Sequence, residues 1–344
     1  MKNILFIILI ISNIFASISL SGDARVRPRL DVKEYPDEST QKESDLYYLY
    51  RARLNVKADI GDGYFFHAKL GTNEISGMSK MASDGNNSSI PGNLNSSRAQ
   101  VDFLELYYGY KGEKSGLWAG AFPLKHNPAL DIHYYPDKIV DIPFALLNNS
   151  SITGFGGYCT MSKYKLDWFI SVDKQQTNSK IDIEGNKTEL MDSYTLGFNS
   201  KINIGSMSII PRLLFSIADS TEYSPLTFGT DINLMEITGF KPGVSYYMSQ
   251  DSNRENDLSH IRLSVKKQFD LGQLKLFYDL ASSKQKDSEK MDLTYLWASF
   301  SYMLHENEFG SIKLMPTVRI QNGSNSNPDF SRSKFELTTE IKFK

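Results

Sequence analysis

Apolar and charged residues alternate along the chain with a period of two. In the segment 22–33, GDARVRPRLDVK, every second residue from Gly22 is small or apolar, and the residues between them are Asp23, Arg25, Arg27, Arg29, Asp31 and Lys33. A helix would spread these charges around its axis, whereas a β-strand places all of them on one face. The pattern therefore predicts a strand with one apolar and one ionic face. Such a strand fits either a soluble sandwich or a barrel in lipid with a wet interior.

The same alternation returns in the next two segments. From Leu46 to Ile60 one face is apolar or aromatic, and the other face carries Arg51, Arg53, Asn55, Lys57 and Asp59. The segment 64–71 follows the tight-turn sequence Gly-Asp-Gly at 61–63 and has His67 and Lys69 on its polar face. These residues predict an antiparallel hairpin.

A regular rhythm of strands and connections continues to the end of the chain. Further strands are predicted at 98–110, 117–124, 152–161, 164–173, 194–204, 207–217, 231–240, 244–250, 258–269, 274–282, 293–304, 311–322 and 334–344. Every second connection is short, and the longest ones cover 72–97 and 125–150. An even number of strands, with short turns at one end and long loops at the other, is typical of outer-membrane barrels. We therefore expect an all-β, transmembrane, up-and-down antiparallel β-barrel of about 16 strands, with its short turns on the periplasmic side.

The N-terminus predicts export. Lys2 precedes an apolar run that extends to Phe15, and small residues follow at Ser17 and Ser19. This arrangement is typical of a secretory signal peptide, and the run is too short for a membrane anchor. We expect residues 1–19 to be the signal peptide, with cleavage near Ala16 as the alternative, and residues 20–344 to form a single barrel in the outer membrane of a Gram-negative bacterium.

Composition narrows the choice further. The chain has 344 residues, a formal net charge of −2 and 12% aromatic residues. The balanced charge gives no indication of a nucleic-acid partner. A helical membrane protein would need several apolar runs of roughly 20 residues, which the sequence lacks. A transmembrane barrel is compatible with this composition, because the hydropathies of its lipid-facing and lumen-facing residues average out along each strand.

The cost of charge in lipid decides which way the ionic faces point. Each Lys or Arg on the lipid face costs roughly 2–4 kcal/mol at the midplane, so three arginines would cost as much as a whole domain gains on folding. We therefore expect a basic, pore-lining wall made of Arg25, Arg27, Arg29, Arg51, Arg53, Lys57 and Lys69. Two roles stay open for this wall. It attracts anionic solutes, or it is held in ion pairs by Asp23, Asp31, Asp59, Glu336 and Glu340.

The connection 125–150 differs from the other long loops because it is rich in Leu, Ile, Tyr and Phe. By the strand count it is the third extracellular loop, and here the chain resembles the Gram-negative porins, sixteen-stranded barrels whose third loop folds into the lumen. The resemblance implies that Asp131, Asp137 and Asp141 face the basic wall across a constriction, and that the protein is a homotrimer. The final strand also resembles that of outer-membrane proteins, although Phe343 is penultimate. The Pro-Glu-Phe-Gly-Gly loop signature of enteric porins is missing.

The resemblance implies passive diffusion of small hydrophilic solutes, and the basic wall suggests a preference for anions. One alternative is a channel specific for acidic sugars or oligosaccharides, as in alginate-type porins; another is a non-conducting structural barrel. An enzyme is not expected, because the five histidines lie in no HExxH motif and the chain has no GxSxG motif. We expect no cofactor and no metal, since His126 and His133 have no further ligand at suitable spacing.

Overall fold

The computed structural model describes residues 17–35, 42–72, 78–81, 100–123, 151–161, 164–175, 180–181, 187–188, 192–218, 224–251, 255–284, 286–287, 289–324 and 329–344. All regular secondary structure in these ranges is β-strand. Among the same residues, no helix is long and apolar enough to cross a membrane.

The described strands are β1 (Ser17–Glu34), β2 (Lys42–Gly61), β3 (Tyr64–Thr72), β4 (Ser79–Lys80), β5 (Val101–Lys111), β6 (Ser115–Phe122), β7 (Ile152–Met161), β8 (Tyr164–Lys174), β9 (Lys180–Ile181), β10 (Lys187–Thr188), β11 (Ser193–Ile204), β12 (Met207–Ile217), β13 (Pro225–Asn233), β14 (Phe240–Asp251), β15 (Asn256–Phe269), β16 (Gly272–Lys284), β17 (Met291–Asn307), β18 (Gly310–Ser324) and β19 (Phe330–Phe343). The two-residue strand β4 pairs with β2, and β9 pairs only with β10. The other 16 strands form the wall of a barrel.

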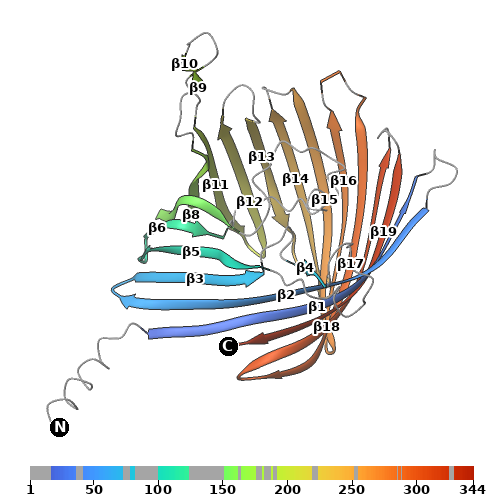
Figure 1. The fold of residues 1–344 in the computed structure, drawn as a ribbon, viewed down its shortest axis with the longest axis horizontal. Coiled ribbons are helices and arrows are strands. Elements are labelled where there is room, and N and C mark those ends of the chain that lie inside the picture. The colour runs from blue at the N-terminus through green and yellow to red at the C-terminus, as the bar shows by residue number, and fades with distance from the viewer. Residues whose placement is uncertain are drawn as a thin grey trace.

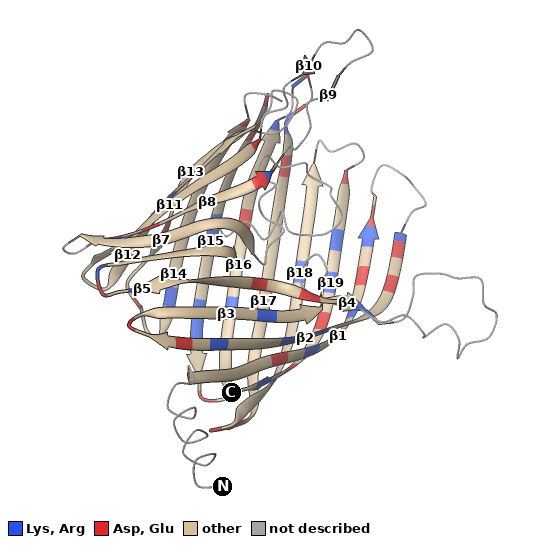
Figure 2. Ribbon diagram, turned by 60° about the vertical axis from the view of Figure 1, so that its left-hand side comes forward, with Lys and Arg blue, Asp and Glu red and all other residues tan. Residues whose placement is uncertain are grey.

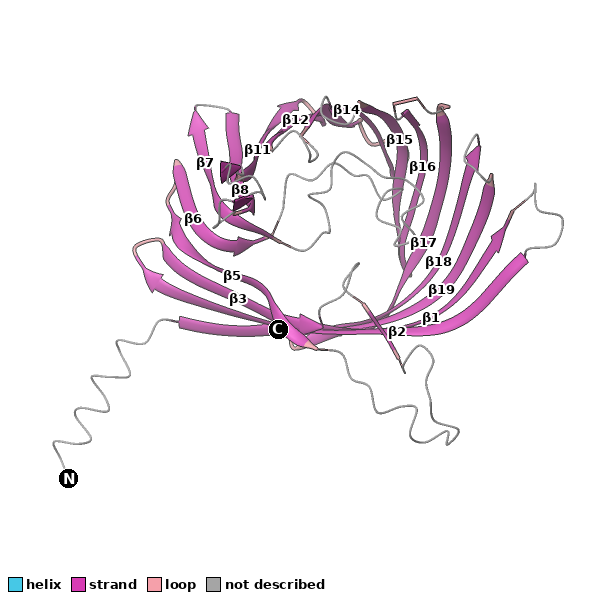
Figure 3. Ribbon diagram, turned by 45° about the horizontal axis from the view of Figure 1, so that its top comes forward, coloured by secondary structure: helices cyan, strands magenta, loops and turns pink. Residues whose placement is uncertain are grey.

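The barrel is closed by its first and last strands. Each wall strand is antiparallel to its neighbours in the sequence, and β1 pairs with both β2 and β19. Figure 1 shows the blue first strands running beside the red last ones, and Figure 3 shows the wall strands arranged in a ring. This arrangement confirms the predicted up-and-down barrel.

The connections at one end of the barrel are short. Residues 62–63, 205–206, 270–271 and 308–309 each join two long strands in a tight turn. The connections at the other end are mostly longer, and those after β3, β6 and β8 span the most residues. The alternation of short turns and longer loops therefore follows the predicted rhythm.

The two faces of the wall have opposite chemistry. Large apolar residues such as Val26, Phe335 and Leu337 are exposed on the outer face, with 44%, 48% and 45% of their surfaces accessible. Charged residues such as Arg29 and Glu336 are buried on the inner face. Figure 2 shows positive and negative bands on adjacent strands around the seam of β1 and β19. This distribution is the reverse of that in a soluble protein and suits a barrel surrounded by lipid.

Apolar side chains pack in two places inside the wall, and an open sector lies beside them. On the side of β6, β7, β8 and β12, an apolar cluster of Phe122, Ile152, Phe169 and Leu214 packs inside the wall. Open space lies on the other side, against β1 and the strands from β12 to β19. Of the charged residues of the seam, Arg25, Arg27, Glu340 and Lys342 line this open sector.

The predicted boundaries of β13 and β14 are wrong. The sequence pattern placed strands at 231–240 and 244–250 with a turn at 241–243, but β13 ends at Asn233 and the residues Lys241, Pro242 and Gly243 lie inside β14. The actual turn is at Thr238 and Gly239, whose φ angles of 49° and 81° suit a two-residue hairpin. Pro225 was interpreted as part of a loop, although proline is tolerated as the first residue of a strand.

Candidate functional site

The barrel encloses a cavity of about 1010 Å³ in its open sector. Its wall comes from β1 and from strands β12 to β19. The charged residues that line it are Arg25, Arg27, Arg262, Lys266, Lys275, Lys313, Arg319, Lys342, Asp231, Asp270, Glu306 and Glu340. Basic residues thus outnumber acidic ones by eight to four in this lining.

The arginines of β1 face carboxylates on β19. The strand register places Arg25 opposite Glu340 and Arg29 opposite Glu336. Arg25 forms an ion pair with Glu340. The Nε of Arg29 donates a hydrogen bond of 2.6 Å to Oε1 of Glu336. Alternating charges on the first and last strands are therefore brought together only when the barrel closes.

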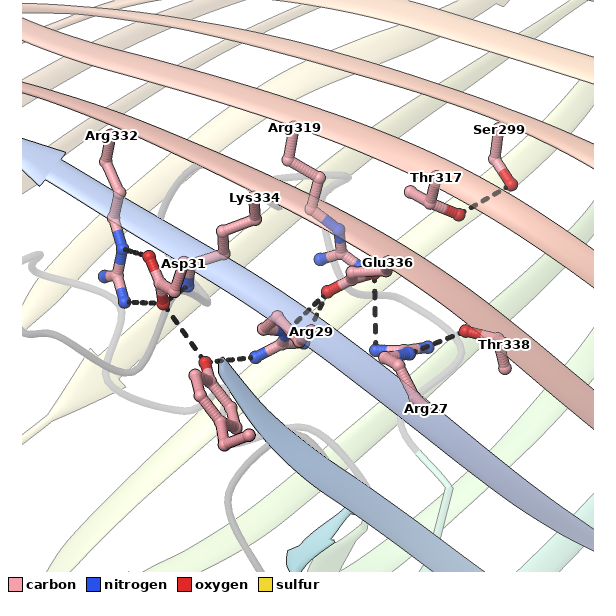
Figure 4. Close-up of polar contacts among 11 residues, drawn as sticks. Arg27, Arg29, Asp31, Ser299, Thr317, Arg319, Arg332, Lys334, Glu336 and Thr338 are labelled. Carbon is pink, nitrogen blue, oxygen red and sulfur yellow. Dashed lines mark hydrogen bonds and ion pairs between the residues drawn. The ribbon is translucent and has the colours of Figure 1, made fainter. Parts of the chain in front are cut away.

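Glu336 is the centre of a cluster of three arginines (Figure 4). Its buried carboxylate lies 2.6 Å from Arg29, 2.9 Å from Arg319 and 3.7 Å from Arg27. Arg27 also donates a 2.7 Å hydrogen bond to Thr338. A single carboxylate cannot neutralise three guanidinium groups, so this part of the wall keeps a positive charge.

A second cluster surrounds Asp31 and is connected to the first one. Arg332 holds Asp31 through two hydrogen bonds of 2.7 and 2.5 Å, and the ammonium group of Lys334 lies 3.6 Å away. The hydroxyl of Tyr47 donates to Asp31 and accepts from Arg29, each at 3.1 Å. Bidentate arginine contacts of this kind fix geometry as well as charge. The two clusters therefore form one rigid network along the seam.

The basic residues of β2 are also paired. Arg51 and Arg53 donate hydrogen bonds of 2.7 and 2.8 Å to Asp23, as their position beside β1 predicted. Asp59 forms no ion pair with an arginine among the described residues; it lies beside the exposed turn after β2, where its carboxylate accepts a hydrogen bond from the backbone N–H of Gly61. The expectation that Asp59 neutralises an arginine is therefore wrong; the sharp turn that follows β2 engages it instead.

The remaining residues of the predicted basic wall differ in their partners and in their exposure. Lys69 on β3 forms an ion pair with Glu105 on β5, and His67 lies 3.0 Å from the same carboxylate. Lys57 is exposed near the short-turn end of β2. Of the predicted basic wall, Arg25 and Arg27 line the cavity directly. Asp131, Asp137 and Asp141 lie outside the described residues, as does the whole segment 125–150 that was expected to fold inward.

Several interior residues were missed by sequence analysis. Arg332 was assigned to a loop, although the alternation of β19 continues back through Lys334 to Arg332 and Phe330. Lys275 was not noted, although it alternates with Leu274 and Leu276. Extending each alternating pattern until it breaks would have found both. Tyr47 gives no such signal, because its role depends on two partners from other positions in the sequence.

An aromatic stack lies in the same cavity. The rings of Phe277 and Trp297 are parallel within 10° at a centroid distance of 4.9 Å. The guanidinium carbon of Arg262 lies 3.9 Å from the centroid of the Phe277 ring, and Arg262 is held by two hydrogen bonds to Asp279. The stack adds flat apolar surface to an otherwise polar wall.

No group of three or more His, Cys, Asp or Glu side chains in the described ranges is arranged to hold a metal ion. The charged clusters instead combine guanidinium and ammonium groups with isolated carboxylates.

The fold has known counterparts, although no protein-family model and no curated protein matches the chain. OmpT of Vibrio cholerae in its trimer form superposes with a TM-score of 0.57 at 10% identity, covering 96% of this chain and 100% of that one. The outer membrane channel DcaP of Acinetobacter baumannii gives 0.57 at 13% identity, with 96% and 98% covered. OmpF of Salmonella typhi, in complex with daunomycin, gives 0.56 at 11% identity, with 95% and 98% covered.

The closed antiparallel barrel and these likenesses define the fold of the chain. More narrowly, the chain has the fold of the porins with 16 strands.

Proposed function

We propose that this protein is an outer-membrane porin, a channel and not an enzyme, through which small hydrophilic solutes diffuse with a preference for anions. The observation that carries the proposal is the cavity, which is lined by eight basic and four acidic residues. Charge of one sign inside a low-dielectric wall concentrates counter-ions and speeds their entry. The acidic residues of the third loop, Asp131, Asp137 and Asp141, belong to this proposal as the opposite side of a constriction.

The ion pairs of the seam are compatible with a role in selectivity. The network in Figure 4 contains four arginines, Arg27, Arg29, Arg319 and Arg332, and the buried Lys334, but only the two carboxylates of Asp31 and Glu336. The carboxylates hold the cationic side chains in place, and the excess charge acts on solutes. The structural and the selective role of the predicted wall therefore coexist.

Reconstitution into planar bilayers tests this function. We expect stable conductance steps, and a reversal potential in a KCl gradient that shows chloride passing more readily than potassium. Arg27→Gln should shift the reversal potential toward cations, because Arg27 lines the cavity and Glu336 keeps two other arginines. Arg53→Gln makes the same charge change at a residue that binds Asp23, and should shift it less.

Two results would contradict the proposal. The absence of conductance steps from folded protein would favour a structural barrel without a pore. A clear preference for potassium would support a pore but would contradict the proposed anion selectivity. The measurements should be made at low salt, since the Debye length is about 10 Å at 0.1 M and screening weakens selectivity at higher concentrations.

A channel for acidic sugars is the second candidate, and the Phe277–Trp297 stack beside Arg262 favours it. A flat apolar surface next to a guanidinium group suits a sugar ring that carries a carboxylate. An oligomer of uronic acids should then reduce the chloride conductance, whereas a neutral oligosaccharide of equal length should not. Equal effects of both would reject this candidate.

Export and assembly belong to the same proposal. We infer a cleaved signal peptide, a location in the outer membrane of a Gram-negative bacterium and a homotrimer. Strand β1 begins at Ser17, so cleavage near Ala16 would leave the strand intact, whereas cleavage after Ser19 would remove its first residues. N-terminal sequencing of the mature protein distinguishes the two sites. Native mass spectrometry in detergent tests the trimer.

A further inference from the structure

One group of charges in the barrel is arranged differently from the seam. Lys241 on β14, Lys266 on β15 and Lys275 on β16 are direct neighbours across the strands. Lys313 on β18 lines the same cavity as Lys266 and Lys275. We call Lys266, Lys275 and Lys313 the lysine triad. Figure 2 shows positive bands side by side on adjacent strands in this part of the wall.

Among the described residues, the triad forms no ion pair with a carboxylate, although Lys313 lies directly opposite Glu340 across β18 and β19. In the part of the chain that the structure describes, no ion pair joins Lys266, Lys275 or Lys313 to an acidic side chain. Two acids nearby form ion pairs with other residues. Glu236 lies 3.4 Å from Lys241, and Glu340 pairs with Arg25 and Lys342. Asp270 and Glu306 also line the cavity.

Electrostatics within the triad are repulsive. The charges that act most strongly on Lys275 are the ammonium groups of Lys266, Lys313 and Lys342, and Glu340 opposes them. Like charges directly opposite each other across two strands are destabilising. Every arginine of the seam avoids this cost by binding a carboxylate, and the triad does not. Such a local violation of stability rules is expected where a function requires it.

Each of the three lysines lies close to the short turn of its own hairpin. Lys266 is three residues before the end of β15, while Lys275 and Lys313 are each three residues after the start of their strands. At the strand rise of about 3.4 Å per residue, each lysine lies roughly 10 Å along its strand from that turn. Gln268, Gln273 and Ser301 line the cavity near them and offer further hydrogen-bond donors.

We propose that the lysine triad is a binding site for a multivalent oxyanion, a phosphate group in the first instance, at the short-turn end of the pore. This proposal rests on the proposed channel function and identifies the solute class that the pore favours. Three ammonium groups that line one cavity suit an anion of two or more charges better than chloride. Ammonium groups are strongly hydrated point charges, so the anion binds without the fixed geometry of an arginine fork. Binding is therefore weak enough for the anion to leave.

Conductance measurements with added phosphate test the site. In planar bilayers at constant ionic strength, we expect phosphate to reduce the chloride current through the wild-type channel, and acetate to reduce it far less. The double variant Lys275→Gln/Lys313→Gln should raise the half-blocking phosphate concentration roughly tenfold. An unchanged half-blocking concentration in this variant would overturn the proposal.

A matched control variant distinguishes binding at the lysine triad from an effect of the net charge of the protein. Lys165 on β8 and Lys201 on β11 are also direct cross-strand neighbours, but they do not line the cavity, and Asp167 lies 3.6 Å from Lys165. Lys165→Gln/Lys201→Gln should leave the phosphate effect as in the wild type. If both double variants weaken the phosphate effect equally, overall charge is responsible and the triad is not a site.

Chemical labelling of the wild-type protein provides a test that needs no variant and no conductance. Folded protein in detergent is acetylated with and without phosphate, and the modified lysines are quantified by mass spectrometry. We expect phosphate to slow acetylation of Lys266, Lys275 and Lys313, but not of Lys201. Equal rates would overturn the triad as a site. Protection of the triad in a protein that gives no conductance steps would support the site while rejecting the channel.

Discussion

At the scale of single residues, the seam between β1 and β19 concentrates the buried charges. Arg25, Arg29 and Asp31 on β1 each find an opposite charge on β19. A shift of the pairing by one residue would turn every charge on the slipped strand toward lipid. The ion pairs therefore specify register where the two ends of the chain must meet.

Glu336→Gln should destabilise the barrel strongly. The change removes the charge that Arg27, Arg29 and Arg319 share, and leaves buried guanidinium groups without compensation. Breaking a buried ion pair on one side costs about 3–5 kcal/mol. The measurement is the free energy of unfolding by urea in lipid vesicles. Glu34→Gln is the control, because its ion pair with Lys42 is exposed and is worth about 0–1 kcal/mol. Equal effects of the two changes would show that Glu336 does not hold the seam.

Sequence alone predicts which residues face inward but not which partners they bind. Alternation places Arg25, Arg27 and Arg29 on one face, and the cost of charge in lipid turns that face inward. Their partners depend on the offset between two strands at opposite ends of the chain. A slip by two residues would keep every side chain on its proper face, so alternation does not distinguish Glu336 from Lys334 or Thr338 as the partner of Arg29.

At the scale of strands, glycines lie opposite aromatic residues in neighbouring strands. A large ring on one strand covers the empty position on the next one, which stabilises the pair. These cross-strand neighbours are Gly22 and Phe343, Gly116 and Tyr158, Gly197 and Phe169, Gly229 and Tyr247, and Gly323 and Phe330. In each pair a Cβ atom on the glycine would lie 2.4 Å or less from the ring.

Gly197→Ala tests this packing. Its Cβ would lie 1.9 Å from Cε1 of Phe169, whose side chain is fully buried against Phe122, Ile152 and Leu214. The ring has no free space to move into, so overpacking should cost about 1–3 kcal/mol. Phe169→Ala also destabilises, but in the double variant the clash is absent. The summed losses of the single variants should therefore exceed the loss of the double variant by about 1–3 kcal/mol in urea unfolding. Strict additivity would mean that the ring and the glycine do not interact.

Strand boundaries were predictable where turn residues and alternation agree. The strands at 152–161 and 207–217 coincide with β7 and β12. The failure at β13 and β14 has a local cause, because Pro225, Pro242 and Gly243 lie inside strands and imitate turn signals. The hairpin turn at Thr238 and Gly239 was missed because threonine seldom adopts a positive φ.

At the scale of the whole molecule, closure explains why the apolar face of the chain can stay exposed. A closed barrel has no free strand edge, so each wall strand is paired with a neighbouring strand on both sides. Closure depends on one long-range pairing, β1 with β19, whereas the other wall strands pair with near neighbours in the sequence. The rhythm of turns predicted this topology, but the closing register could only come from the structure.

A disulfide across the seam tests closure and register together. Val26 and Thr339 are direct neighbours across β1 and β19, and both lie on the outer face. In a Cys159→Ser background, Val26→Cys/Thr339→Cys should form a disulfide, because directly paired strand residues lie within the Cα separation of about 4.4–6.8 Å that a disulfide needs. Val26→Cys/Leu337→Cys moves one partner by two residues, or about 7 Å, and should not cross-link. Gel mobility with and without reductant measures the cross-link. The opposite result, with a disulfide at Leu337 and none at Thr339, would mean that the strands close in a register shifted by two, and Arg29 would then face a residue other than Glu336.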